Sequence, residues 1–439
     1  MRLAVFTSKY PARIATFFER DMRALIEAGL EIEVFAISPL EASAWDHSLD
    51  LLGPSHLPRH RVHHLEVWQA VKLGRPLVLK RFGRVRTDTW AILRATARYG
   101  PVRLAKTAYA LPKAWAWAAQ YTGRYDHVLA YWGNYAGTIA YAFHRLAAPQ
   151  QPFSIWLHAG TDLYRAPAFM REKLTYADNV LTCCEFNQGY IMERFGDVPG
   201  IRRKLHVCHH GLNLGEFPFQ QDGRAPATLL AVGSLSKRKG FDYLVRAAQE
   251  LRAQGQDVKV EFVGDGEERS ALQRLATNLG LADRVIFRGW QPFAAVRDAM
   301  NRATILVHPS DGLGDGLPNV VREAMALGTP VVASAVAGIP DALRDGCGVL
   351  VPPKDVHALA GEIARLLREP QERRAIAQRA RHRTEEKYDL WRNGATLARL
   401  LQNTRRAGAA RPTASANRRR SSSPKIRRRR GRSGAPGRS

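Results

Sequence analysis

Short apolar runs alternate along the chain with longer segments of helical periodicity. The runs are five to seven residues long and rich in Val, Ile, Leu and Phe, which is typical of strands buried on both faces of a parallel sheet. Between the first two runs, apolar residues recur at helical spacing from Ile14 to Ala28, and Gly29 stands where a helix would end. The alternation predicts an α/β fold. Strands are predicted at residues 2–7, 31–37, 127–132, 153–157, 179–183, 204–208, 228–233, 258–264, 285–289, 304–310 and 330–334.

A polar stretch at residues 220–227 interrupts this rhythm and is interpreted as a linker between two domains. We expect a first doubly wound, Rossmann-like domain over residues 1–218 and a second over residues 222–387. A helix at about residues 388–402 is expected to pack back on the first domain. Ligands of such sheets bind beyond the carboxyl ends of the strands, so the two domains are expected to face each other across a cleft.

Half of the net charge of +26 lies in the last residues of the chain. Residues 405–439 contain 13 Lys and Arg and no acid, and Ile426 is their one large aliphatic residue. Such a composition buries too little surface to offset the entropy of ordering, so a disordered basic tail is predicted. The tail is either an electrostatic tether to anionic lipid or nucleic acid, or an extension without a role of its own.

A second basic concentration lies within residues 66–120. Eleven Lys and Arg face only two acids there, Glu66 and Asp88. Helices that place cations beside aromatic rings suit the interface of an anionic bilayer. Solvated helix faces whose aromatics belong to the core are the alternative. The interleaved aromatic residues are Trp68, Phe82, Trp90, Tyr99, Tyr109, Trp115 and Trp117.

The sequence predicts neither a membrane-spanning helix nor a disulfide framework. No run approaches about 18 apolar residues, and the apolar run within residues 1–8 is too short for the core of a signal peptide. The four cysteines show neither paired spacing nor a C-x-x-C motif, so small buried residues are expected. We expect a cytoplasmic protein, peripheral at the inner face of the cytoplasmic membrane, with no specific nucleic-acid partner.

The most informative segment is HPSDGLGDGLPNVVREAMALGTPVVAS, at residues 308–334. It combines a strand, a glycine-rich loop and a helix predicted to begin at Pro318, and free N–H groups at such a helix start bind anions. Asp315 at the loop and Glu323 in the helix are candidate hydrogen-bond acceptors for sugar or ribose diols. A capping Asp and a solvent-facing Glu are the alternative.

Two further loops follow predicted strands. VGSLSKRKGFDYLV, at residues 232–245, places Gly233 at a tight turn and three cations before a helix, which suits a diphosphate. It lacks the spacing of a P-loop, and a surface cluster of cations is the alternative. In FSIWLHAGTDLY, at residues 153–164, His158 directly follows a strand, with Thr161 and Asp162 beyond it. This histidine is either structural or part of the site in the cleft.

Taken together, these segments resemble the GT-B fold glycosyltransferases of family 4, which are retaining enzymes that transfer a sugar from a nucleotide-sugar donor. The resemblance covers about residues 1–401. It is most specific in the second domain, through VGSLSKRKGFDYLV, EFVGDGEER, VIFRGW and DGLPNVVREAMALGTPVVAS. In the first domain, KYPARIATFFERDMRALIEAGLEIEVFAI, HAGTDLY, CCEFNQGYI and CHHGLNLGEF are similar to the branch that builds bacterial exopolysaccharides and lipopolysaccharides.

The resemblance implies roles for individual residues. Glu323 matches the second acid of the E-x7-E motif and would hold the ribose hydroxyls. Asp315 takes the first acid position, where Glu is usual, and would contact hydroxyls of the donor sugar. The main-chain N–H of Asn319 would meet the diphosphate, and His158 would contact the donor sugar.

Lys239 matches the diphosphate lysine of the family, whereas Ser234 stands where an arginine is frequent. Lys237 or Arg238 would then compensate for the missing charge. The implied catalytic residues are His158, Asp315 and Lys239. The implied nucleotide-sugar-binding residues are Gly233, Ser234, Arg238, Lys239, Asp315, Gly316, Leu317, Asn319 and Glu323.

The implied function is transfer of a hexose from an NDP-sugar to a glycan or lipid-linked acceptor, in the biosynthesis of bacterial cell-surface polysaccharide. No metal and no other cofactor is expected. A nucleotide-sugar epimerase of similar fold is one alternative. A non-catalytic protein that binds nucleotide-sugars or anionic surfaces is another.

Overall fold

The computed structural model describes residues 1–11, 16–38, 57–160, 162–165 and 167–404. The chain divides into two units, residues 1–406 and 407–439, and every described helix and strand belongs to the first of them. The prediction of a disordered tail, the start of the first predicted helix and Thr161 lie outside the described residues.

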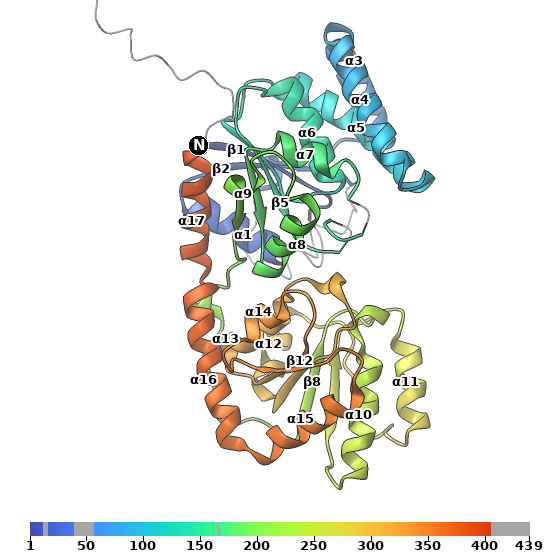
Figure 1. The fold of residues 1–439 in the computed structure, drawn as a ribbon, viewed down its shortest axis with the longest axis vertical. Coiled ribbons are helices and arrows are strands. Elements are labelled where there is room, and N and C mark those ends of the chain that lie inside the picture. Colours follow the sequence, from blue (N-terminus) through green and yellow to red (C-terminus); the bar gives the residue numbers. More distant parts are fainter. Residues whose placement is uncertain (12–15, 39–56, 161, 166, 405–439) are drawn as a thin grey trace, which may run out of the picture. The chain divides into compact units, whose positions relative to one another are not determined.

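Two parallel sheets make up the fold, and they confirm the predicted α/β class (Figure 1). The first has the strand order β3-β2-β1-β4-β5-β6-β7, and the second has the order β10-β9-β8-β11-β12-β13. The strands of the first sheet are β1 (Arg2–Thr7), β2 (Glu31–Ala36), β3 (Val62–His63), β4 (His127–Ala130), β5 (Phe153–Leu157), β6 (Asn179–Thr182) and β7 (Leu205–Val207). Those of the second are β8 (Thr228–Val232), β9 (Lys259–Val263), β10 (Val285–Phe287), β11 (Ile305–His308), β12 (Val331–Ser334) and β13 (Val349–Val351).

Helices cover the faces of both sheets, so the central strands are buried on both sides (Figure 1). All residues of β5 and β8 are buried, as continuous apolar runs predict. In the first half the helices are α1 (Thr16–Glu27), α3 (Val67–Lys80), α4 (Phe82–Ala97), α5 (Pro101–Tyr121), α6 (Tyr135–Ala147), α7 (Met170–Tyr176), α8 (Glu185–Phe195) and α9 (Ile201–Lys204). In the second half they are α10 (Phe241–Ala253), α11 (Arg269–Asn278), α12 (Phe293–Arg302), α13 (Asn319–Leu327), α14 (Ile339–Leu343), α15 (Val356–Arg368), α16 (Pro370–Lys387) and α17 (Leu390–Asn403).

The last helix packs against the first half of the chain. Helix α17 lies against α1, and Gly394 faces Ala24 there. A Cβ at Gly394 would lie 2.4 Å from the Cβ of Ala24, so a larger residue would push the two helices apart. This contact ties the end of the described chain to the first sheet.

The polar stretch at residues 220–227 contains neither helix nor strand, but Arg224 anchors it to the second half. Its guanidinium donates to the carbonyl oxygens of Met300, Asn301 and Ala303, near the end of α12, and to that of Leu327, the last residue of α13. Carbonyls at helix C-termini lack partners within the helix. Hydrogen bonds of Arg224 therefore hold the segment against the ends of α12 and α13.

Candidate functional site

The loops that follow β8 and β11 meet at the carboxyl end of the second sheet. Gly240 ends a short 3-10 turn, Lys237–Lys239, in the left-handed conformation with φ of +61°. A Cβ there would lie 2.2 Å from the carbonyl oxygen of Pro309, so only glycine allows this approach. The close approach brings the cationic loop onto the glycine-rich loop.

Lys239 and Asp315 form a buried ion pair at this junction. The Lys239 Nζ lies 2.7 Å from Oδ1 and 2.9 Å from Oδ2 of Asp315. His308, at the end of β11, contributes a third contact, because its Nε2 lies 2.6 Å from Asp315 Oδ2. An ionised carboxylate only accepts, so the Nε2–H of His308 is the donor.

The charges of the three residues follow from these contacts. Burial alone would raise the pKa of Asp315, but the hydrogen bond from His308 and the charge of Lys239 hold that pKa well below its usual range. Burial and the charge of Lys239 together lower the pKa of His308, which favours the neutral imidazole. Asp315 is therefore an ionised acceptor, and the sequence did not identify the histidine that orients it.

The two other cations of the same loop are both exposed but differ in their contacts. Arg238 donates from Nη1 to the carbonyl oxygen of Gly314 at 3.2 Å, and so reaches the glycine-rich loop. Lys237 is exposed. Ser234, which the family resemblance places where arginine is frequent, lies with its Oγ 3.4 Å from the Oγ of Ser236.

Glu323 lies on α13, which begins at Asn319, one residue after the predicted start. It is buried rather than facing solvent, so the alternative of a solvated glutamate is wrong. Arg20 of α1 donates from Nη1 to Glu323 Oε1 at 2.9 Å. The guanidinium of Arg20 also lies over the rings of Phe217 and Phe293, with centroid distances of 5.5 and 5.3 Å.

His158 is placed against the glycine-rich loop by its neighbours. A Cβ at Gly316 would lie 2.7 Å from the Cβ of Ala159, and one at Gly160 would lie 3.5 Å from the carbonyl oxygen of Gly314. The loop after β5 therefore meets the loop after β11. The structure brings the predicted residues of both halves to one place.

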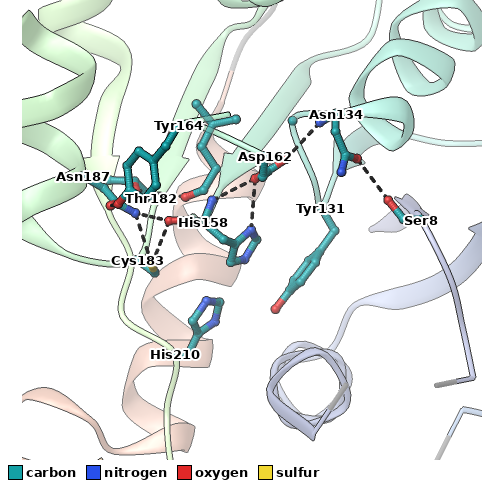
Figure 2. A network of polar contacts seen from close by, with 12 residues as sticks. Ser8, Tyr131, Asn134, His158, Asp162, Tyr164, Thr182, Cys183, Asn187 and His210 are labelled. Carbon is teal, nitrogen blue, oxygen red and sulfur yellow. Dashed lines mark hydrogen bonds and ion pairs between the residues drawn. The ribbon is translucent and has the colours of Figure 1, made fainter. Parts of the chain in front are cut away.

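The backbone around His158 is held by a polar network (Figure 2). The main-chain N–H of His158 donates to Asp162 Oδ2, and that of Asn134 donates to Asp162 Oδ1, both at 2.9 Å. The ring Nδ1 of His158 lies 3.7 Å from Asp162 Oδ2, beyond hydrogen-bond distance. Neither ring nitrogen of this buried histidine has a hydrogen-bond partner among the described residues. The ring is enclosed by Trp132, Tyr131 and His210, so the structure keeps both nitrogens away from solvent.

A second histidine, His210, stacks on His158. The two rings are almost parallel, at 5°, with centroids 5.0 Å apart (Figure 2). The Nδ1 of His210 lies 2.6 Å from Asp21 Oδ2, which also accepts from the hydroxyl of Tyr131. Burial alone would lower the pKa of His210, but the Asp21 carboxylate raises it to about 9. The sequence assigned no role to this imidazolium, although His210 lies in the segment CHHGLNLGEF.

The described residues hold neither a membrane-spanning helix nor a metal-binding cluster. No helix there is both long enough and apolar enough to span a bilayer. No group of three His, Cys, Asp or Glu side chains suited to a metal ion occurs in this part of the chain. All four cysteines are free, and Cys183, Cys184 and Cys347 are buried.

Two parallel sheets with site residues on the loops at their carboxyl ends make up a GT-B type fold. Solved structures share this fold over nearly the whole chain. A sucrose-phosphate synthase from Thermosynechococcus elongatus has a TM-score of 0.70 at 20% identity, covering 92% of this chain and 98% of that one. The HepE protein of Anabaena, solved in complex with UDP-glucose, has a TM-score of 0.63 at 18% identity, covering 92% and 99%.

Residues 217–383 match the family described as glycosyl transferases group 1. This match lies in the second half of the chain, and together with the named relatives below it shows that the protein is a glycosyltransferase. An Escherichia coli (strain K12) protein is 27% identical over 92% of this chain and 100% of its own length, and its name provisionally assigns it to colanic acid biosynthesis. The amylovoran biosynthesis glycosyltransferase of Erwinia amylovora is 25% identical, covering 92% and 99%. A lipopolysaccharide core biosynthesis glycosyltransferase of Rhizobium meliloti (strain 1021) is 32% identical, covering 47% and 60%.

Proposed function

We propose that this protein is a retaining glycosyltransferase that moves a sugar from an NDP-sugar to a glycan or lipid-linked acceptor in the synthesis of bacterial cell-surface polysaccharide. The single observation that carries the proposal is the meeting of the Lys239–Asp315 pair with the loop that bears His158. The names of the relatives support the polysaccharide pathway. The UDP-glucose in the Anabaena structure supports a nucleotide-sugar donor.

In the proposed reaction, negative charge grows on the diphosphate as the glycosidic bond breaks. Lys239 and the main-chain N–H groups at the start of α13 stabilise that charge. Asp315, kept ionised by the hydrogen bond from His308 and the charge of Lys239, accepts hydrogen bonds from hydroxyls of the donor sugar. A cationic lysine makes a metal ion unnecessary for the leaving group, so we propose a metal-independent reaction.

Glu323 is proposed to bind the ribose. Arg20 contacts Oε1 of its carboxylate, which leaves Oε2 to accept a hydrogen bond from a ribose hydroxyl. The acceptor is proposed to be lipid-linked, so the protein works as a peripheral protein at the cytoplasmic face of the membrane.

The test uses the full chain and a panel of nucleotide-sugars. A true donor raises the temperature of unfolding, because it binds only the folded state, and it is consumed when an acceptor glycan is added. The anomeric configuration of the product decides retention. A donor that is converted to its epimer without any acceptor would show an epimerase instead. Stabilisation without any turnover would identify a binding protein.

A further inference from the structure

Residues 66–120 are here called the α3–α5 unit. The positive charge of this unit is not balanced by ion pairs. None of its eleven Lys and Arg forms an ion pair with a described residue. Of its two acids, Asp88 is buried and pairs with Arg145 at 2.7 Å, outside the unit. By contrast, α16 pairs its own cations, as in Arg379–Glu372 and Arg381–Glu385. Lys113 is buried and donates to the carbonyl oxygen of Ile37, but the other ten cations can bind an external anion.

Helix α3 combines these cations with exposed apolar side chains. Trp68 is 81% exposed and Leu79 is 67% exposed. Lys72 and Arg75 lie between them at helical spacing, so all four share one face of the helix. The opposite face packs on α5 at Gly74, where a Cβ would lie 3.0 Å from the Cβ of Trp115. The exposed row is therefore not needed for the contact between the two helices.

The same mixture recurs on the next two helices. On α4, Trp90 is 62% exposed and the Arg94 guanidinium lies over its ring at 4.9 Å. On α5, Val102 is 66% exposed, and Lys106 and Tyr109 follow it at helical spacing. Rings and aliphatic groups beside cations suit the headgroup depth of an anionic bilayer. A nucleic acid would bind the cations but gives no reason for the exposed aliphatic groups.

A cavity of about 500 Å³ lies where the end of α4, the start of α5 and the start of α6 come together. This volume is in the range of small-molecule pockets. Arg103 and Lys106 line it and form no ion pair with a described residue. Tyr99, Val102 and Tyr135 give it an apolar part. The lining thus suits a ligand that is anionic at one end and apolar at the other.

One wall of this cavity is fixed by a buried lysine. Lys173 Nζ donates to the carbonyl oxygens of Asn134 at 3.4 Å and Ala168 at 3.0 Å, and to Thr138 Oγ1 at 3.2 Å. All three acceptor residues line the cavity. The main-chain N–H groups of Asn134 and His158 both donate to the carboxylate of Asp162 (Figure 2). These hydrogen bonds fix the cavity wall before any ligand binds. Asn134, which lines the cavity, connects it to the loop of the candidate site.

We propose that the α3–α5 unit binds an anionic bilayer and that its cavity receives the phosphate of an amphiphile, with Arg103 and Lys106 against the phosphate oxygens. The exposed rows of the three helices lie in the headgroup region. The amphiphile is either a phospholipid or a lipid-linked acceptor phosphate, and the second identity rests on the proposed function.

Tryptophan fluorescence of the full chain tests the bilayer contact. Residues 405–439 contain no Trp, so quenching by brominated lipid chains reports on the folded part even when the basic tail also binds. We expect quenching by vesicles of phosphatidylcholine with phosphatidylglycerol, and little by phosphatidylcholine alone. Trp68→Tyr combined with Trp90→Tyr should remove more than half of it, whereas Trp290→Tyr, in the second half, should not. Binding with no loss of quenching in the double variant, or equal quenching without anionic lipid, would overturn the proposal.

A soluble probe tests the cavity separately. Geranyl phosphate should bind, and Arg103→Gln with Lys106→Gln should weaken that binding at least about tenfold by calorimetry, since two charge-assisted contacts are lost. Arg274→Gln with Arg368→Gln changes the net charge equally at exposed positions of α11 and α15 and should have no effect. Equal affinity for inorganic phosphate, or unchanged binding of geranyl phosphate, would overturn the cavity assignment. A short-chain phosphatidylglycerol added to the same calorimetry distinguishes the two lipid sources. If it binds with equal affinity and loses that affinity in the Arg103 and Lys106 variant, the cavity takes a phospholipid, whereas binding of geranyl phosphate alone indicates a lipid-linked acceptor phosphate. None of these measurements requires transfer, so the proposed function can fail independently.

Discussion

Lys239 and Asp315 neutralise each other in a buried contact, and a bound diphosphate would bring two further negative charges beside the lysine. We expect Lys239→Ala to lower kcat/KM by roughly a hundredfold or more, because this charge is needed most in the transition state. The measurement of kcat/KM follows the release of NDP with one nucleotide-sugar as the donor. Lys237→Ala is the comparison, since that lysine is exposed on the same turn and loses activity only if it compensates for the missing charge at Ser234. If both variants lost activity equally, the activity would depend on the total positive charge of the loop and not on the buried contact between Lys239 and Asp315.

His210 makes the stability of the protein depend on pH. Its pKa is raised from the usual 6.5 to about 9 by Asp21, so the folded state holds the proton more tightly than the unfolded state. This stabilisation, about 3 kcal/mol, is fully present below pH 6.5 and is lost as pH rises through 9. In urea unfolding, Asp21→Asn should lower the free energy of unfolding most at pH 6, and the difference from wild type should narrow by pH 9.5. A difference that stays constant would contradict the assignment.

At the scale of elements, Arg224 connects the ends of two helices. Its guanidinium serves carbonyls of α12 and α13 and the Oγ1 of Thr329. Arg224→Ala removes a donor that all of these acceptors share, although the carbonyl oxygens of Met300 and Leu327 keep a second one, from Thr329 Oγ1 and from the main-chain N–H of Gln220. We expect a loss of about 2–4 kcal/mol in guanidinium chloride unfolding. Arg374→Ala removes an exposed pair with Asp222 and should cost at most about 1 kcal/mol. Equal losses would mean that the hydrogen bonds to the helix ends contribute little.

Apolar runs in the sequence are enough to locate most strands, since each predicted range contains one observed strand. The sequence did not predict the short strands β3 and β13, because two or three residues at the edge of a sheet form no recognisable apolar run. Most of the predicted site residues lie on loops whose glycines and charges are local signals, and Asn319 and Glu323 lie on the helix that follows one of these loops. Partners such as His308 and Arg20 carry no such signal. Arg20 lies 303 residues from Glu323, and only the tertiary fold brings the two together.

At the scale of the whole molecule, the ion pair between Arg20 and Glu323 links α1 in the first half to α13 in the second. If Arg20 holds the carboxylate through Oε1 so that Oε2 faces the ribose, both residues act through one group. Glu323→Gln should then cost roughly 2 kcal/mol or more in kcat/KM, because a charge-assisted acceptor is lost. Arg20→Gln should cost less, because the carboxylate remains but is no longer oriented.

The double variant decides whether this ion pair and the donor site are coupled. Two residues that act through the same carboxylate should be non-additive, so Arg20→Gln should add little once Glu323 is Gln. NDP affinity by calorimetry and kcat/KM are measured for all four proteins of the cycle, and thermal unfolding identifies any variant that merely loses stability. Additive losses in affinity would mean that Arg20 joins the two halves without orienting the ribose acceptor. A gain in NDP affinity for Arg20→Gln alone would mean that the arginine competes with the nucleotide for Glu323.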